Sequence, residues 1–205
     1  MGWYDLFAPF YDASVERLYR EQRAAAAEAL DLGGGPLALL DLPTGTGQSL
    51  PYLAGEGRTI IGVDFSEGML RQAKKRVAKE ALPGVHLLRG DARSLSAQDL
   101  APAEVSQVDR LHIFLGLSAF PDWEQAFENL WGLLAPGGLC AVVDVYAEKP
   151  GFQGKMVEWV AKAELSRRTW EPLERLAEDF QKVPLPSLPD HGGDLFLATG
   201  RKPAS

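Results

Sequence analysis

The sequence predicts a doubly wound α/β sheet, because three features recur along its 205 residues. Short apolar runs, typical of strands buried on both faces, alternate with segments of helical periodicity. The connections between them are short and contain glycine and proline. Strand and helix alternate five times in this way. Such alternation is typical of a parallel sheet joined by right-handed crossover connections.

Each predicted strand is a short run rich in apolar residues, bounded by turn-forming or charged residues. In chain order the strands are expected at residues 37–42, 59–64 and 85–91, within 107–117, and at 139–146 and 194–202. The fifth strand follows the turn sequence "PGG" at 136–138. His86 starts the third strand, and His112 within the fourth is expected to be a hydrogen-bonded core residue.

The predicted helices show apolar residues at helical spacing and recognisable ends. They are expected at residues 15–32, 46–55, 67–82 and 122–135, with helical structure over 153–182. The first is alanine-rich and ends at three glycines, 33–35. Ser66 is expected to cap the third helix, and Thr169 to cap a helix with Pro172 in its first turn.

Composition limits the class of protein and the kind of partner. Apolar residues make up 46% and charged residues 24% of a chain long enough for one sizeable core. The net charge of −7 argues against a nucleic-acid partner and favours a small molecule. The single cysteine, Cys140, lies in an apolar run and is expected to be buried. Without a signal peptide or an apolar run of ~20 residues, the expected compartment is the cytoplasm.

Two glycines one residue apart, Gly45 and Gly47, follow the first predicted strand. In an open α/β sheet this loop lies beyond the carboxyl ends of the strands, where ligands bind. A dinucleotide site needs a third glycine, but leucine stands at that place, position 50. A P-loop needs a lysine that the sequence lacks here. Both kinds of phosphate site are therefore disfavoured.

Acidic residues end the first three predicted strands or follow them closely. Asp41 belongs to the first, Asp64 ends the second, and Asp91 ends the third. A carboxylate at Asp64 can accept hydrogen bonds from both hydroxyls of a ribose, and one at Asp91 from the amino group of adenine. Together with the glycines, these acids predict a site for an adenosine without phosphates.

These motifs resemble those of class I S-adenosylmethionine (SAM)-dependent methyltransferases, especially enzymes related to the ubiquinone/menaquinone methyltransferases. The stretches that carry the resemblance are "DLPTGTG" from Asp41, "GVDFSEGML" around Asp64, "GDA" at 90–92 and "LLAPGG" at 133–138. Pro43 departs from the family pattern, which usually has glycine there. The resemblance implies a Rossmann-like, seven-stranded, mostly parallel sheet with helices on both faces and an antiparallel last strand. The cofactor-binding residues it implies are Tyr11, Asp41, Pro43, Gly45, Gly47, Asp64, Phe65, Met69, Asp91, Ala92 and Phe114.

No catalytic base is identified by the motifs. Where many relatives carry a pair of histidines, this sequence has Ser118 and Ala119. The candidates that remain for a chemical role are His191, Ser118 and Tyr146. His191 lies in the loop before the last strand, which should return to the ligand side of the sheet. Two tryptophans, Trp159 and Trp170, are candidates to line the acceptor pocket.

The sequence thus predicts a SAM-dependent methyltransferase that methylates an amine or hydroxyl of a small molecule, without a metal. Three alternatives remain open: a lipid-headgroup N-methyltransferase, a non-catalytic SAM- or nucleoside-binding module, and a nucleotide-dependent oxidoreductase. Residues 1–16 lack both lysine and arginine, so no stable membrane association is expected. The single domain 1–205 is expected to comprise an N-terminal helical lid segment (1–32), a cofactor-binding core (37–146), a helical insertion with an acceptor-side loop (147–193) and the last strand (194–202).

Overall fold

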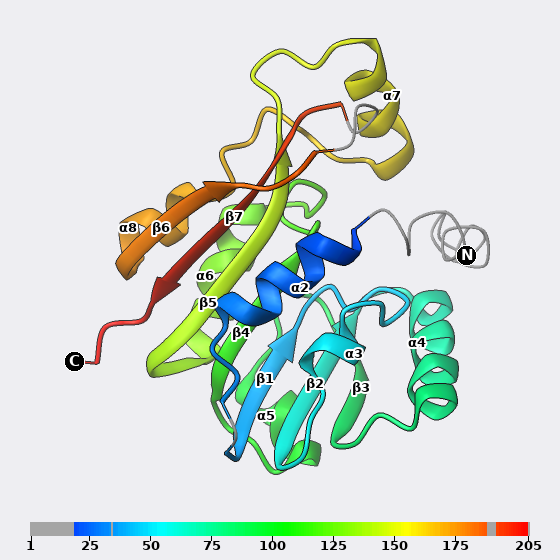
Figure 1. Ribbon diagram of the computed structural model, residues 1–205, viewed down its shortest axis with the longest axis vertical. Helices are drawn as coiled ribbons and strands as arrows, with labels where there is room; N and C mark the ends of the chain where they lie inside the picture. Colours follow the sequence, from blue (N-terminus) through cyan, green and yellow to red (C-terminus); the bar gives the residue numbers. More distant parts are fainter. Residues whose placement is uncertain (1–18, 34, 188–191, 205) are drawn as a thin grey trace.

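The computed structural model describes residues 19–33, 35–187 and 192–204, which form a seven-stranded sheet (Figure 1). The strand order is β3-β2-β1-β4-β5-β7-β6. Strands β1 to β5 are parallel, and β7 runs antiparallel to both of its neighbours. The strands are β1 (Leu37–Asp41), β2 (Arg58–Asp64), β3 (Val85–Arg89), β4 (Val108–Phe114), β5 (Leu134–Tyr146), β6 (Glu178–Pro184) and β7 (Asp194–Arg201). The predicted sheet with an antiparallel last strand is confirmed.

Helices cover both faces of the sheet, as predicted. One apolar core includes Phe127 and Leu173 from two helices, and the other includes Leu30 and Leu53 from the opposite side. The helices are α2 (Arg20–Ala29), α3 (Leu50–Leu53), α4 (Glu67–Glu80), α5 (Ala97–Leu100), α6 (Trp123–Leu133), α7 (Phe152–Ala161) and α8 (Glu171–Leu176), with a 3-10 turn at Ala101–Ala103. None of the described helices is long and apolar enough to cross a lipid bilayer.

The prediction of helical structure over 153–182 is wrong at its end, where β6 begins at Glu178. The sequence "EDFQKVP" is mostly polar and mostly exposed, so it lacks the apolar pattern that identifies a strand. Its pairing with β7 creates the strand, and only the edge of the sheet tolerates Pro184. The expected insertion 147–193 therefore contains a strand as well as helices.

Two boundaries also differ from the sequence prediction. The helix expected over 46–55 is a single turn, α3, because the preceding residues form the loop that carries the two glycines. The "PGG" at 136–138 lies inside β5, which already begins at Leu134. There the pairing of β4 with β5 shifts register between Val108 and Arg110, which absorbs the extra residues.

The prediction that Thr169 caps a helix is wrong, since Trp170 precedes α8 and no side chain caps it. Three other predictions about single side chains are confirmed. The Ser66 hydroxyl accepts a hydrogen bond from the Met69 N–H, 3.2 Å away, and so caps α4. His112 is fully buried, and its Nδ1 lies 2.7 Å from Asp41 Oδ1. Cys140 is buried, and burial raises the pKa of its thiol.

We expect Phe127→Ala to lower the free energy of unfolding by about 3–5 kcal/mol, because it empties a fully buried position on α6. Phe152→Ala is the matched control, since Phe152 is 86% exposed. Urea unfolding of both variants measures the difference. Equal losses of stability would contradict the assignment of the core.

Candidate functional site

A cleft of about 350 Å³ opens at the carboxyl ends of the strands, where β1 lies between β2 and β4. The chain continues from β1 to β2 and β3 on one side and returns to β4 on the other, so this is the topological switch point of the sheet. The loops after β1, β2, β3 and β4 all line the cleft, and α2 contributes one side chain. The lining residues discussed below are Arg23, Pro43, Gly45, Gln48, Asp64, Phe65, Met69, Asp91, Ala92, Arg93, Phe114 and the segment Leu115 to Pro121.

The two glycines of the β1 loop have different surroundings. Both have positive φ, +55° for Gly45 and +79° for Gly47. A Cβ at Gly45 would meet no protein atom within 4 Å, and Gly45 lines the cleft. A Cβ at Gly47 would lie 3.2 Å from the Ala73 Cα on α4. Gly45 therefore leaves space for a ligand, whereas Gly47 lets the loop pack on the helix.

Asp64, the last residue of β2, is 9% exposed and faces the cleft. Its Oδ2 accepts a hydrogen bond from the Gly45 N–H at 2.9 Å, and its Oδ1 accepts one from the Ser66 N–H at 2.8 Å. Burial raises the pKa of this carboxyl, and the two backbone donors oppose that shift. Asp64 therefore joins the β1 loop to the β2 end and keeps lone pairs for a ligand.

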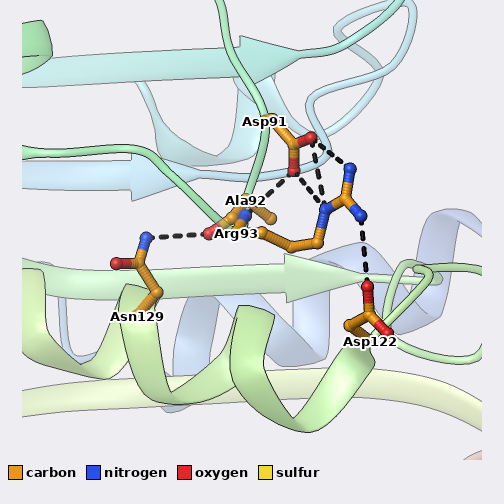
Figure 2. Close-up of polar contacts among 5 residues, drawn as sticks. All are labelled: Asp91, Ala92, Arg93, Asp122 and Asn129. Atoms are coloured by element: carbon orange, nitrogen blue, oxygen red, sulfur yellow. Dashed lines mark hydrogen bonds and ion pairs between the residues drawn. The ribbon is translucent and has the colours of Figure 1, made fainter.

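The acid after β3 is paired within the protein (Figure 2). Arg93 donates to both carboxylate oxygens of Asp91, with Nη2 2.6 Å from Oδ2, and its Nη1 lies 3.2 Å from Asp122 Oδ2. The Arg93 guanidinium lowers the pKa of Asp91. Asn129 of α6 donates to the carbonyl of Ala92 at 2.8 Å. The turn is thereby fixed against α6, and Asp91 reaches the cleft as an oriented carboxylate.

Arg23 of α2 is a cleft residue that the sequence interpretation missed. It is 5% exposed, donates to Gln48 Oε1, and lies 5.1 Å from the ring centroid of Phe114. Its Nε has no hydrogen-bond partner, and among the described residues no carboxylate pairs with it. Burial lowers the pKa of its guanidinium. The available signal was an arginine in the same helical stripe as Ala26 and Ala27, which are buried.

The loop after β4 forms an apolar wall, comprising Leu115, Gly116, Ala119, Phe120 and Pro121. None of these side chains titrates. A Cβ on Gly116 would lie 2.4 Å from the Pro43 ring, so glycine here makes room for the proline that departs from the family pattern.

The apolar wall is held from behind by two charged residues. Buried Asp144 accepts from the Ser118 N–H at 2.8 Å and from the Ser118 hydroxyl at 2.7 Å. Arg167 donates to the carbonyl of Phe120 at 2.7 Å. The wall is therefore positioned by residues from β5 and from the segment between α7 and α8.

Several predicted site residues do not line the cleft. Asp41 is fully buried beneath it and accepts from the Thr44 hydroxyl at 2.7 Å. Ser118 points to Asp144 rather than to the cleft, and Tyr146 packs edge-to-face on Trp170 with ring centroids 5.0 Å apart. Trp159 is 74% exposed on α7. Tyr11 and His191 lie outside the described residues.

Residues 39–138 match the family model of a methyltransferase domain. The demethylmenaquinone methyltransferase of Lactococcus lactis is 34% identical over 117 residues, which cover 56% of this chain and 43% of that protein. The ubiquinone/menaquinone biosynthesis C-methyltransferase of Acidiphilium cryptum is 31% identical over 139 residues, covering 67% of this chain and 52% of the relative. The chain thus matches only about half the length of these curated relatives.

The fold is similar to that of the N-methyltransferase NodS of Bradyrhizobium japonicum in complex with S-adenosylhomocysteine. The TM-score is 0.71 at 16% sequence identity, with 91% of this chain and 88% of that chain covered. This similarity supports the fold of the whole described sheet, beyond the segment that the family model matches.

We expect Gly45→Ala and Gly47→Ala to separate ligand binding from stability. Each loses roughly 1–2 kcal/mol of stability because alanine is strained at positive φ. Gly47→Ala loses a further ~1–3 kcal/mol from overpacking against α4. Gly45→Ala should instead weaken binding of an adenosine-containing ligand at least tenfold. Thermal unfolding and calorimetric titration measure the two effects, and a reversed order of stabilities would contradict the roles assigned to the glycines.

The buried carboxyl of Asp144 should make stability fall as pH rises above ~4. Burial is the largest influence on this carboxyl, and it raises the pKa in the folded protein. The unfolded chain therefore loses this proton first, so ionisation favours unfolding until the folded-state pKa is passed.

Asp144→Asn should flatten that slope, although it leaves a donor facing the Ser118 N–H and lowers overall stability. Asp99→Asn is the control, because hydrogen bonds from Ser96 lower the pKa of Asp99. The contribution of Asp99 to the pH dependence of stability is therefore confined to pH below ~4, and its loss should leave the slope above that pH unchanged. Urea unfolding at a series of pH values measures both slopes. An unchanged slope in Asp144→Asn would contradict the assignment.

Proposed function

The chain is a class I methyltransferase related to the quinone methyltransferases, and from this premise we propose that it uses SAM to methylate a small molecule. The observation that carries the proposal is the position of Asp64 at the cleft, with both oxygens oriented by backbone donors. A carboxylate so held can accept hydrogen bonds from the two ribose hydroxyls of SAM. This arrangement needs no phosphate-binding lysine.

The other cleft residues suit the remaining parts of SAM. Asp91 and the Ala92 backbone would contact the adenine edge, and Phe65 and Met69 lie where its ring faces would pack. Arg23 would pair with the carboxylate of the methionyl group, since its buried guanidinium lacks an anionic partner among the described residues. The Gly45 backbone would lie along the ligand.

The apolar wall after β4 would face the acceptor. Transfer forms a bond from the acceptor to the methyl carbon, breaks the bond from that carbon to sulfur, and leaves neutral S-adenosylhomocysteine. The described wall has no titratable side chain, so it favours a nucleophile that loses its proton after the attack. A neutral amine fits this condition, as does a ring carbon of an ionised hydroquinone; an alcohol does not. The wall would contribute mainly by aligning the reactants in a dry site.

Of the two acceptors predicted from the sequence, the amine is retained in the proposal and the alcohol hydroxyl is not. A ring carbon is added as an acceptor atom because the A. cryptum relative is named a C-methyltransferase. Incubation with methyl-labelled SAM and a panel of amines, hydroquinones, alcohols and lipids with amino headgroups tests the acceptor. Nuclear magnetic resonance of the product identifies the methylated atom. Methylation of alcohols alone would contradict this interpretation of the wall.

SAM and S-adenosylhomocysteine should stabilise the wild-type protein in thermal unfolding, whereas NAD and ATP should not. At ~100 times its Kd a ligand adds ~2.7 kcal/mol. Asp64→Ala should lose most of this gain, because it removes the acceptor proposed for the ribose. Glu56→Ala, an exposed acid outside the cleft lining, is the matched control and should keep it. Stabilisation by NAD or ATP alone would refute the proposed cofactor.

A further inference from the structure

Helix α7 presents three large apolar side chains to solvent. The exposed fractions are 86% for Phe152, 54% for Met156 and 74% for Trp159. With about 100° of rotation per residue, their spacing places all three within an arc of roughly 60° on one side of the helix. Monomeric proteins seldom gather large apolar side chains in one exposed place without a function for them.

The opposite side of α7 is attached to the rest of the protein, so this exposure follows from how the helix packs. Gly154 is buried, and a Cβ there would lie 2.8 Å from the carbonyl oxygen of Gly192, next to β7. Glu158 accepts a hydrogen bond from the Leu165 N–H at 3.0 Å. These contacts turn the face of Phe152, Met156 and Trp159 outward.

Basic residues lie beside this apolar face. Lys149, Lys155 and Lys162 are all exposed, and Lys155 and Lys162 flank the apolar arc on one side of the helix. The acids nearby are exposed Glu148, Glu158, which accepts from the Leu165 N–H, and Glu164, which pairs with Arg167. Over residues 148–167 the basic side chains Lys149, Lys155, Lys162 and Arg167 outnumber the acidic ones by one, so the segment has a small excess of positive charge in a chain whose net charge is −7.

The apolar face lies on the ligand side of the sheet. Figure 1 shows α7 beyond the carboxyl end of β5, on the side toward which the parallel strands point. The segment after α7 contacts the apolar wall of the cleft, since the Glu164 N–H donates to the Ser118 carbonyl at 2.8 Å. Arg167 donates to carbonyls of the same loop. A surface bound to α7 would therefore be close to the acceptor side of the cleft.

We propose that α7 docks reversibly on an anionic lipid bilayer, with Phe152, Met156 and Trp159 at the boundary between headgroups and acyl chains. Lysines beside an apolar face with tryptophan and phenylalanine are the pattern of interfacial helices. Lys155 and Lys162 beside the patch disfavour a second copy of the chain, since the same lysines would face each other across a two-fold axis.

The expectation of no stable membrane association was argued from residues 1–16, whereas the docking proposed here is reversible and uses α7. Vesicle binding does not depend on the proposed function. The role of docking does rest on the proposed function, since a lipophilic acceptor held in the bilayer could pass from the membrane to the apolar wall.

The test is co-sedimentation of the full chain, without SAM, with phosphatidylcholine vesicles that contain or lack phosphatidylserine. We expect binding to the anionic vesicles only, weakened by salt. Phe152→Ser combined with Trp159→Ser should lower the partition coefficient at least tenfold. Val183→Ser, at an exposed apolar position on β6, should leave it unchanged.

A second pair of variants tests the charge. Changing Lys149, Lys155 and Lys162 together to Gln should also lower binding at least tenfold. The same change at Lys74, Lys75 and Lys79, exposed on α4, should have at most a small effect. Circular dichroism and thermal unfolding establish that each variant folds.

Three outcomes would overturn the proposal. The first is equal binding to vesicles with and without phosphatidylserine, and the second is an equal loss in the α4 variant. The third is dimerisation in sedimentation velocity that the Phe152 and Trp159 changes abolish, without vesicle binding by the wild type. Because no SAM is present, failure here is distinguishable from failure of the proposed methyl transfer.

Discussion

The hydrogen bonds that Asp64 accepts from the N–H groups of Gly45 and Ser66 are the interaction on which the cleft depends. They join the end of β2 to the loop after β1 and to the start of α4. The Thr44 N–H also donates to the Val63 carbonyl at 2.8 Å, which strengthens the same junction. A carboxylate is needed at this place because both of its oxygens accept a backbone hydrogen bond. The cost of burying this charge is reflected in the raised pKa of Asp64.

The same cleft buries a cation as well as an anion. Arg23 contacts Gln48 and the ring of Phe114, neither of which neutralises its charge, while Asp64 is satisfied by neutral donors. Burying unpaired charge is costly, so Arg23, which has no anionic partner among the described residues, gains when a ligand supplies one. Asp64 gains when ligand hydroxyls donate to its remaining lone pairs. A ligand with ribose hydroxyls at one end and a carboxylate at the other matches both requirements. Nucleotides that carry phosphates in place of a sulfonium and an amino-acid group match them less well.

Sequence alone predicted the cofactor half of the molecule better than the acceptor half. Asp64 ends an apolar strand and Asp91 closely follows the next one, and their motifs have characteristic spacing, so fold and cleft follow from local patterns. Arg23 was missed because an arginine in an alanine-rich helix has no motif around it. Strand β6 was missed because its pairing partner, β7, is what makes it a strand. The pairing of Arg93 with Asp122 was also missed, since it depends on contact between the turn after β3 and the start of α6.

The proposed acceptor side of the cleft is built by long-range contacts, which explains why no sequence motif identifies it. Asp144 on β5 holds Ser118, and Arg167 holds the carbonyls of the same loop, so the apolar wall takes its shape from residues distant in the sequence. A buried carboxylate and a guanidinium that bind backbone groups fix the position of the loop and leave its cleft-facing side chains apolar. The segment that carries Arg167 also continues from α7. Changes in that segment can therefore alter the acceptor wall while Asp64 and the glycine loop, which are fixed by β1 and β2, stay in place.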